Sequence, residues 1–114
     1  MATFTKLALS GSTSGRGIVV DDDATAGKLI HTAHATALDE VWLYAANYDT
    51  TDRKLTIEWG GTTAGGDIIE YTVKAENGLY LIVPGLIITG SLVVRAFAAT
   101  TSSINIFGYV NRIA

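Results

Sequence analysis

A hydroxyl-rich loop near the start of the chain is the first place where these residues could do chemistry. Residues 11–15 (GSTSG) resemble the G-x-S-x-G sequence of serine hydrolases, in which a strained turn exposes the nucleophile. The central residue here is Thr13, however, and no strand–helix alternation surrounds it to supply an α/β sheet. We therefore expect a solvated loop at this position rather than a nucleophile.

Two histidines and a run of aspartates are the residues best suited to bind a metal ion. His31 and His34 are three residues apart, and on an extended chain this spacing points them to opposite faces. The aspartates at 21–23 could offer oxygen ligands to Ca²⁺, but they lack the alternating D-x-D-x-D-G layout of a calcium loop. Neither group forms a complete ligand set, so we expect no metal site.

Other residues that commonly support catalysis or cofactor binding are missing or lack the required context. The chain has no cysteine, which excludes disulfides, thiolate zinc sites and cysteine nucleophiles. The paired glycines at 60–61 and 65–66 resemble phosphate-binding loops only in glycine content, because no lysine follows and no helix is expected behind them. We therefore expect no catalytic residue, no cofactor and no enzymatic activity.

The elements that would position these residues are all predicted to be strands. Apolar residues alternate with polar ones in short segments, and clusters of Gly, Asp, Asn, Ser and Thr separate the segments. The expected strands cover residues 3–9, 17–20, 28–33, 41–46, 53–59, 67–74, 79–83, 91–98 and 103–110, with a short further segment at 86–89. The pattern predicts an all-β fold, an antiparallel β-sandwich of jelly-roll or immunoglobulin-like type with eight to nine short strands.

Turn residues suggest how these strands connect. We expect hairpins around residues 48–52, around the Asn-Gly pair at 77–78 and around residues 100–103, and a turn at Pro84-Gly85. The 114 residues fit one domain, residues 1–114. Residues 1–17 would supply a first strand, or an arm able to pair with a neighbouring subunit, followed by a flexible loop.

The composition favours a protein that works through contacts with other chains. Hydrophobic residues make up 48% of the sequence, charged residues only 17%, and the mean hydropathy is +0.31. Too few charges are present to cover an ordinary surface, which indicates a homo-oligomer or a larger assembly. A net charge of −3 with scattered Lys and Arg disfavours direct nucleic-acid binding. No segment resembles a membrane span or a secretory signal, so we expect synthesis in a cytoplasm and no membrane partner.

The aromatic residues leave a carbohydrate-binding module open as an alternative. Tryptophan and tyrosine side chains can stack on sugars, and the chain has two tryptophans and five tyrosines. Trp42 and Tyr44, however, lie in a strand with large apolar residues on both faces, which predicts a central, buried strand. Core packing is therefore the preferred interpretation of these aromatics.

A series of strand and turn sequences carries a family resemblance. In order along the chain they are KLIHTA (28–33), DEVWLYAAN (39–47), KLTIEWGG (54–61), YLIVPG (80–85), VVRAFAA (93–99) and INIFGYV (104–110). This order resembles small structural proteins of tailed-phage virions, of the capsid decoration or cement type. The resemblance covers about 85 residues.

The resemblance implies a non-enzymatic bacteriophage structural protein located in the virion and assembled in the host cytoplasm. Such a protein would bind the major capsid protein or other virion proteins and stabilise the shell through subunit contacts, most simply as a trimer. A tail, neck or fibre-base component is the alternative within the same class. The residues proposed for the interface are Phe4, Leu7, Leu9, Arg16, His31, His34, Tyr48 and Arg112.

Overall fold

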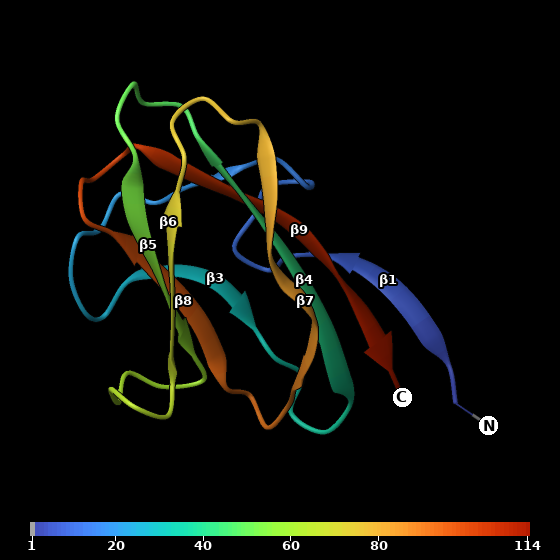
Figure 1. Ribbon diagram of the computed structural model, residues 1–114. Helices are drawn as coiled ribbons and strands as arrows, with labels where there is room; N and C mark the ends of the chain where they lie inside the picture. The colour runs from blue at the N-terminus through green and yellow to red at the C-terminus, as the bar shows by residue number, and fades with distance from the viewer. Residues whose placement is uncertain (1) are drawn as a thin grey trace.

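The computed structural model describes residues 2–114, and in that range the chain forms nine strands and no helix. The strands account for most of the segments predicted above, and their order along the chain is shown in Figure 1. Their bounds are β1 (Phe4–Ala8), β2 (Ile18–Val19), β3 (Lys28–Thr32), β4 (Leu38–Asn47), β5 (Arg53–Trp59), β6 (Ile68–Val73), β7 (Leu79–Ile88), β8 (Val93–Ala98) and β9 (Ile104–Ile113).

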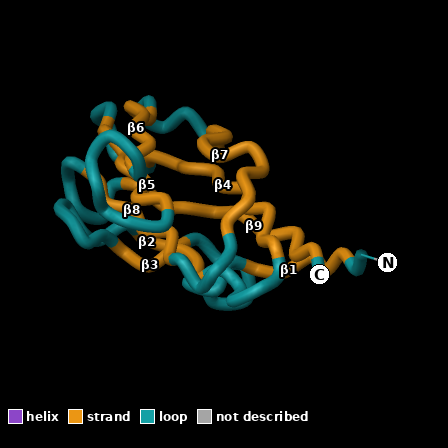
Figure 2. Tube along the Cα trace, turned by 90° about the horizontal axis from the view of Figure 1, so that it is seen from below, coloured by secondary structure: helices purple, strands orange, loops and turns teal. Residues whose placement is uncertain are grey.

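The strands form two antiparallel sheets that pack face to face. Sheet A has the order β1-β9-β4-β7, with β2 also paired to β9, and sheet B has the order β3-β8-β5-β6. In Figure 2 the strands β7, β4, β9 and β1 of sheet A follow one another down one side of the molecule and those of sheet B down the other. This arrangement confirms the predicted all-β antiparallel sandwich of eight to nine strands.

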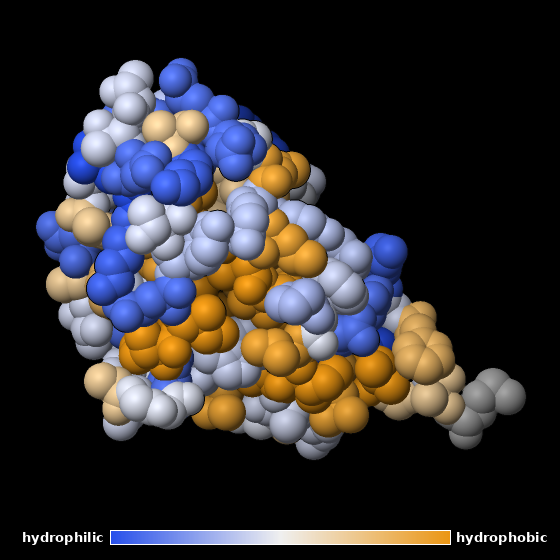
Figure 3. Space-filling model, in the orientation of Figure 1, coloured by the Kyte–Doolittle hydropathy of each residue, from blue (hydrophilic) through white to orange (hydrophobic). Residues whose placement is uncertain are grey.

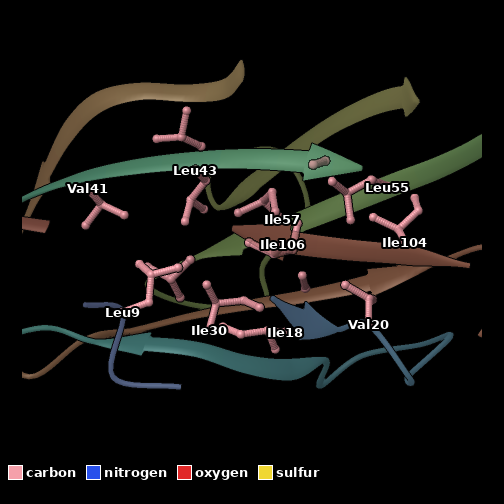
Figure 4. Close-up of a cluster of buried hydrophobic side chains, with 14 of the residues drawn as sticks. Leu9, Ile18, Val20, Ile30, Val41, Leu43, Leu55, Ile57, Ile104 and Ile106 are labelled. Carbon is pink, nitrogen blue, oxygen red and sulfur yellow. The ribbon is translucent and has the colours of Figure 1, made fainter. Parts of the chain in front are cut away.

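One hydrophobic core fills the space between the sheets. Alternate residues of the central strands point inward, among them Val41 and Leu43 of β4 and Leu55 and Ile57 of β5, and each is at most 1% exposed. Figure 4 shows these side chains meeting those of β9 between the two layers. A leucine or isoleucine at such a position typically stabilises the fold by roughly 2–5 kcal/mol relative to alanine.

The connections between strands differ from the predicted hairpins. The links β4–β5, β6–β7 and β8–β9 each cross from one sheet to the other, and among consecutive strands in the described chain only β5 and β6 are hydrogen-bonded to each other. The three predicted hairpins at 48–52, 77–78 and 100–103 are therefore wrong. Turn residues mark a reversal of direction, but the choice of partner depends on which face each strand must bury.

Asn47 shows how one crossing is held. It is the last residue of β4, and its buried side-chain amide donates to the carbonyl oxygens of Thr51 and Val73, both at 2.9 Å. The Asn47 carbonyl oxygen also accepts from the amide of Glu76. These bonds join the end of β4 to the loop before β5, to the end of β6 and to the loop that follows β6.

The expected turn at Pro84-Gly85 is also wrong, because β7 continues through it. The register against β4 shifts between Leu86 and Pro84, which makes Gly85 the extra residue of a β-bulge, and it shifts again between Val83 and Leu81. Gly85 has a φ of 80°, and a Cβ there would lie 2.9 Å from the Trp42 ring. Proline is tolerated because β7 is an edge strand with no neighbour on its other side.

The N-terminal segment lies in its own sheet. β1 pairs with the end of β9 in register from Phe4↔Ile113 to Ala8↔Tyr109, which places the two ends of the chain side by side in Figure 1. Leu9 enters the core at 2% exposure, and Gly11 donates to the carbonyl oxygen of Ile30. In this structure the segment that could serve as an arm is instead a strand that completes sheet A.

Candidate functional site

The most highly organised polar group in the molecule is a buried network centred on Asp39. The Asp39 carboxylate is 0% exposed and accepts two hydrogen bonds from the Arg112 guanidinium, at 2.7 Å from Nε and 3.0 Å. His31 Nε2 lies 2.7 Å from the same carboxylate. Asp39 and Arg112 are register partners on β4 and β9, and His31 comes from β3. The network therefore ties sheet A to sheet B.

The electrostatics of the network keep Asp39 ionised. Burial alone would raise the pKa of Asp39, but the hydrogen bonds from Arg112 and His31 outweigh this effect and lower the pKa from 3.8 to about 2. The hydrogen bonds that Arg112 donates to Asp39 likewise raise the pKa of Arg112. The pair is a permanent charge pair at neutral pH.

The same geometry prevents His31 from acting as a base, because both of its ring nitrogens are occupied. Its Nδ1 accepts a hydrogen bond from the Ser10 amide at 3.0 Å, while Nε2 faces Asp39. The side chain is buried, so neither nitrogen is open to a substrate. The arrangement resembles the histidine–aspartate half of a catalytic triad, but a backbone amide stands where a nucleophile would be required. Its role is to position the segment after β1.

His34 lies in the loop before β4 and is used separately from His31. Its Nδ1 accepts hydrogen bonds from the amides of Thr36 and Ala37, at 3.0 and 2.9 Å, and so closes a turn. His31 thus lies on a strand and His34 in a loop, and the two side chains have different partners. Within residues 2–114 no group of three or more His, Asp or Glu side chains is placed to hold a metal ion.

A second buried carboxylate binds the loop that follows the aspartate run. Glu58 on β5 is 0% exposed and accepts hydrogen bonds from the Thr25 hydroxyl at 2.8 Å and the Gly27 amide at 2.7 Å. These bonds hold Thr25 and Gly27 against Glu58 on the outer face of sheet B. Asp21 itself forms a surface ion pair with Lys28. The carboxylates here stabilise a loop and do not converge on one point.

The outer face of sheet A is a broad surface on which aromatic residues meet. Trp42 and Tyr109 are cross-strand partners whose rings stack with centroids 6.1 Å apart. Lys6 lies over the Tyr109 ring at 4.8 Å, and the Trp42 indole donates to Glu40. These aromatics are half-buried on the outside of the sheet, so the prediction that Trp42 and Tyr44 belong to the core is wrong.

The free edge of sheet A carries the largest group of exposed apolar residues. Residues 78–94 contain no charged residue, and β7 lies within this run. Five apolar side chains of β7 are exposed, and we call them the β7 patch: Leu79, Tyr80, Leu81, Leu86 and Ile87. Figure 3 shows this side of the molecule, with a hydrophobic area that follows β7 toward the chain termini.

The hollows of this surface are shallow. Tyr80 stacks on Tyr71 of β6, with ring centroids 4.5 Å apart, at the point where the edges of the two sheets meet. A hollow of ≈ 160 Å³ lies beside this pair, between β6 and β7. A wider groove of ≈ 440 Å³ lies on sheet B, where Thr25, Glu70 and Phe97 are among the lining residues. No helix in residues 2–114 is long and apolar enough to cross a membrane.

The structure separates the eight residues predicted for an interface. Leu9 and His31 lie in the interior, so in the folded chain they cannot meet another subunit, and Arg112 is engaged by Asp39. The others are partly or fully exposed in separate places: Phe4, Leu7, Arg16, His34 and Tyr48. An interface at these exposed positions stays a prediction. The residues that sequence reasoning missed are those of the β7 patch, which the charge-free run at 78–94 could have indicated.

Comparisons with known proteins do not add to this picture. A scan against protein-family models finds no match, and a search of curated proteins finds no similar protein. Evidence for the function therefore comes from the surfaces described above.

Proposed function

We propose that the protein is a non-enzymatic structural component of a bacteriophage virion, a decoration or cement protein that binds the capsid shell. In this proposal it is assembled in the host cytoplasm, it joins the major capsid protein or other virion proteins, and it stabilises the particle through subunit contacts. The phage context comes from the strand and turn sequences described above. The proposal that it acts through subunit contacts is based on the surface of the folded domain.

The observation that carries the proposal is the β7 patch, which lies on an edge strand with no neighbouring strand on its outer side. Monomeric proteins usually protect an exposed edge with charged side chains, whereas β7 has none and protects itself only with Pro84 and two bulges. Apolar side chains such as Leu79, at 59% exposure, are costly in water and favourable against another protein. An edge of this composition suits a lasting contact with a neighbouring subunit.

A pair of leucine substitutions tests this use of β7. Leu81→Lys places a charge in the β7 patch, while Leu29→Lys places the same charge on β3, the far edge of sheet B, at nearly equal exposure (38% and 37%). We expect Leu81→Lys to reduce co-sedimentation with phage shells that lack this protein by at least about tenfold. Leu29→Lys should bind like the wild type. Equal binding by both variants would contradict the assignment to β7.

Carbohydrate binding is the second candidate, and the position of Trp42 favours it. The Trp42–Tyr109 pair lies on an outer sheet face beside Asn111 and Glu40, which supply hydrogen-bonding groups next to an aromatic surface. Titration with oligosaccharides, followed by tryptophan fluorescence, tests this function. A saturable change that is lost in Trp42→Ala would support it, and an unchanged spectrum would oppose it.

A further inference from the structure

The outward-facing residues of sheet A form rows that can be read from the strand register. Three rows cross β1, β9 and β4 in that order: Phe4, Ile113, Leu38; then Lys6, Asn111, Glu40; then Ala8, Tyr109, Trp42. The first row is apolar, the second polar and the third mainly aromatic. In every row the residue on β1 differs in size or charge from the one on β4.

The polar row contains the only charges on this face. Among the outward positions of β1, β9, β4 and β7, only Lys6 and Glu40 are charged, and they lie on either side of Asn111. Neither forms an ion pair within residues 2–114. Two strand spacings of about 4.8 Å separate their backbones. The face therefore presents one positive and one negative position, symmetrically placed about β9.

We infer that this face packs against the same face of a second copy of the chain, around a two-fold axis that runs along β9. Rotation about that axis places β1 of one copy opposite β4 of the other. Each Lys6 then faces Glu40 of the partner subunit, and Asn111 lies near the axis beside its own counterpart. Sheets that pack face to face lie about 10 Å apart, a distance that a lysine and a glutamate side chain span together.

The neighbouring rows fit the same operation. Trp42 would lie opposite the small Ala8 of the other copy, and Phe4 opposite Leu38. Unlike residues thus meet on the flanking strands, while Tyr109 and Ile113 on β9 each lie near the axis beside the same residue of the second copy, as in a self-complementary two-fold interface. β7 lies beyond the overlapping strands, which leaves the β7 patch free for a different partner. The dimer would cover Trp42, so it competes with carbohydrate binding at this face.

This inference rests on the proposed function, in which the protein works through contacts between subunits. It replaces the trimer expected from the sequence with a two-fold dimer. The three rows form a small contact, on the order of 300 Å² per copy in projection, so free dimers should be weak. Copies held close together on a particle would form them at a much higher effective concentration.

Charge-reversed variants test the pairing directly by analytical ultracentrifugation up to about 1 mM, the range that a weak contact of this size requires. In the Lys6→Glu variant, each copy carries two negative charges on the outer face of sheet A. In the Glu40→Lys variant, each copy carries two positive charges there. We expect each variant alone to dimerise at least about tenfold more weakly than the wild type, and an equal mixture to recover wild-type affinity as a heterodimer. A mixture no tighter than either variant, or a wild type that stays monomeric, would overturn the inference.

Two further variants guard against effects on folding. Glu40→Lys loses the hydrogen bonds from Trp42 and Asn111, so Ala8→Arg, at an exposed position, provides an independent block of the same face. It should abolish the dimer while keeping the native melting temperature, and undiminished dimerisation would refute the assigned face. Lys54→Glu, on the outer face of sheet B, is the matched control and should dimerise normally.

Binding to shells separates this inference from the proposed function. A wild type that dimerises through sheet A but does not bind shells would contradict the proposed function and uphold the dimer. A wild type that stays monomeric but binds shells would uphold the proposed function and contradict the dimer.

Discussion

Asp39 is the residue whose chemistry most strongly couples the strands. It is charged and fully buried, and its donors come from β9, β3 and the loop before β4. Its pKa of about 2, against a usual 3.8, means that the folded chain holds this carboxylate ionised more strongly than the unfolded chain does. The stability gained is present above pH 4 and is lost as the pH falls through the folded-state pKa.

The first prediction is a loss of stability in acid that depends on Asp39. Between pH 4 and pH 2 this one group should remove about 2 kcal/mol from the free energy of unfolding. Asp39→Asn should remove that part of the pH dependence and, by leaving Arg112 without its counter-charge, cost on the order of 3 kcal/mol at pH 7. Urea unfolding at several pH values measures both effects.

The control for this prediction is Asp52→Asn, which removes an exposed carboxylate paired with Lys74. It should change stability by well under about 1 kcal/mol at pH 7. If Asp39→Asn kept the acid transition of the wild type, the network would not be its cause.

Gly108 supports a second prediction at the scale of one residue. A Cβ on Gly108 would lie 2.0 Å from the backbone oxygen of Trp42, which cannot move without breaking the sheet. Gly108→Ala should therefore destabilise the fold by roughly 2 kcal/mol or more. Gly66→Ala, where nothing lies within 4 Å of the added carbon, is the control and should have little effect on the melting temperature. Similar melting temperatures for the two variants would contradict this packing.

At the scale of elements, the sequence predicted the strands better than their partners. Arg53–Trp59 was predicted to the residue, because its alternation is regular and one of its faces is polar. Pro84-Gly85 was misjudged, since a proline on an edge strand removes no hydrogen bond from the ladder. Trp42 was misplaced because both faces of β4 carry large residues, and periodicity alone does not distinguish the core from an outer face. Asp39 gave no sequence signal of burial beyond sharing its face with Val41 and Leu43.

Deleting residues 1–10 tests whether the first strand is an arm or part of the sandwich. Leu9 is in the core, and the Ser10 amide caps His31, so we expect the truncated chain to unfold or to lose several kcal/mol of stability. Phe4→Ala, at a side chain that is 71% exposed, should have little effect on stability. A truncated chain that folds normally but no longer binds its particle or its own copies would instead establish the arm hypothesis.

At the scale of the whole molecule, the low charge content has a structural counterpart. Exposed apolar residues gather along β7, next to an outer face of sheet A with only two charges on its strands. Both surfaces belong to the same sheet, while the outer face of sheet B carries ion pairs such as Lys54–Glu70. The molecule thus has one side suited to contacts with proteins and one suited to water.

The proposal that this chain is a structural part of a virion is tested by the composition of purified particles. Under the proposal a phage genome encodes the chain, and particles of that phage should be purified by density gradient and the chain quantified by mass spectrometry against the major shell protein. We expect a fixed ratio to the shell protein that survives repeated washing and is lost when the gene is deleted. Intact particles that never contain the chain would contradict it.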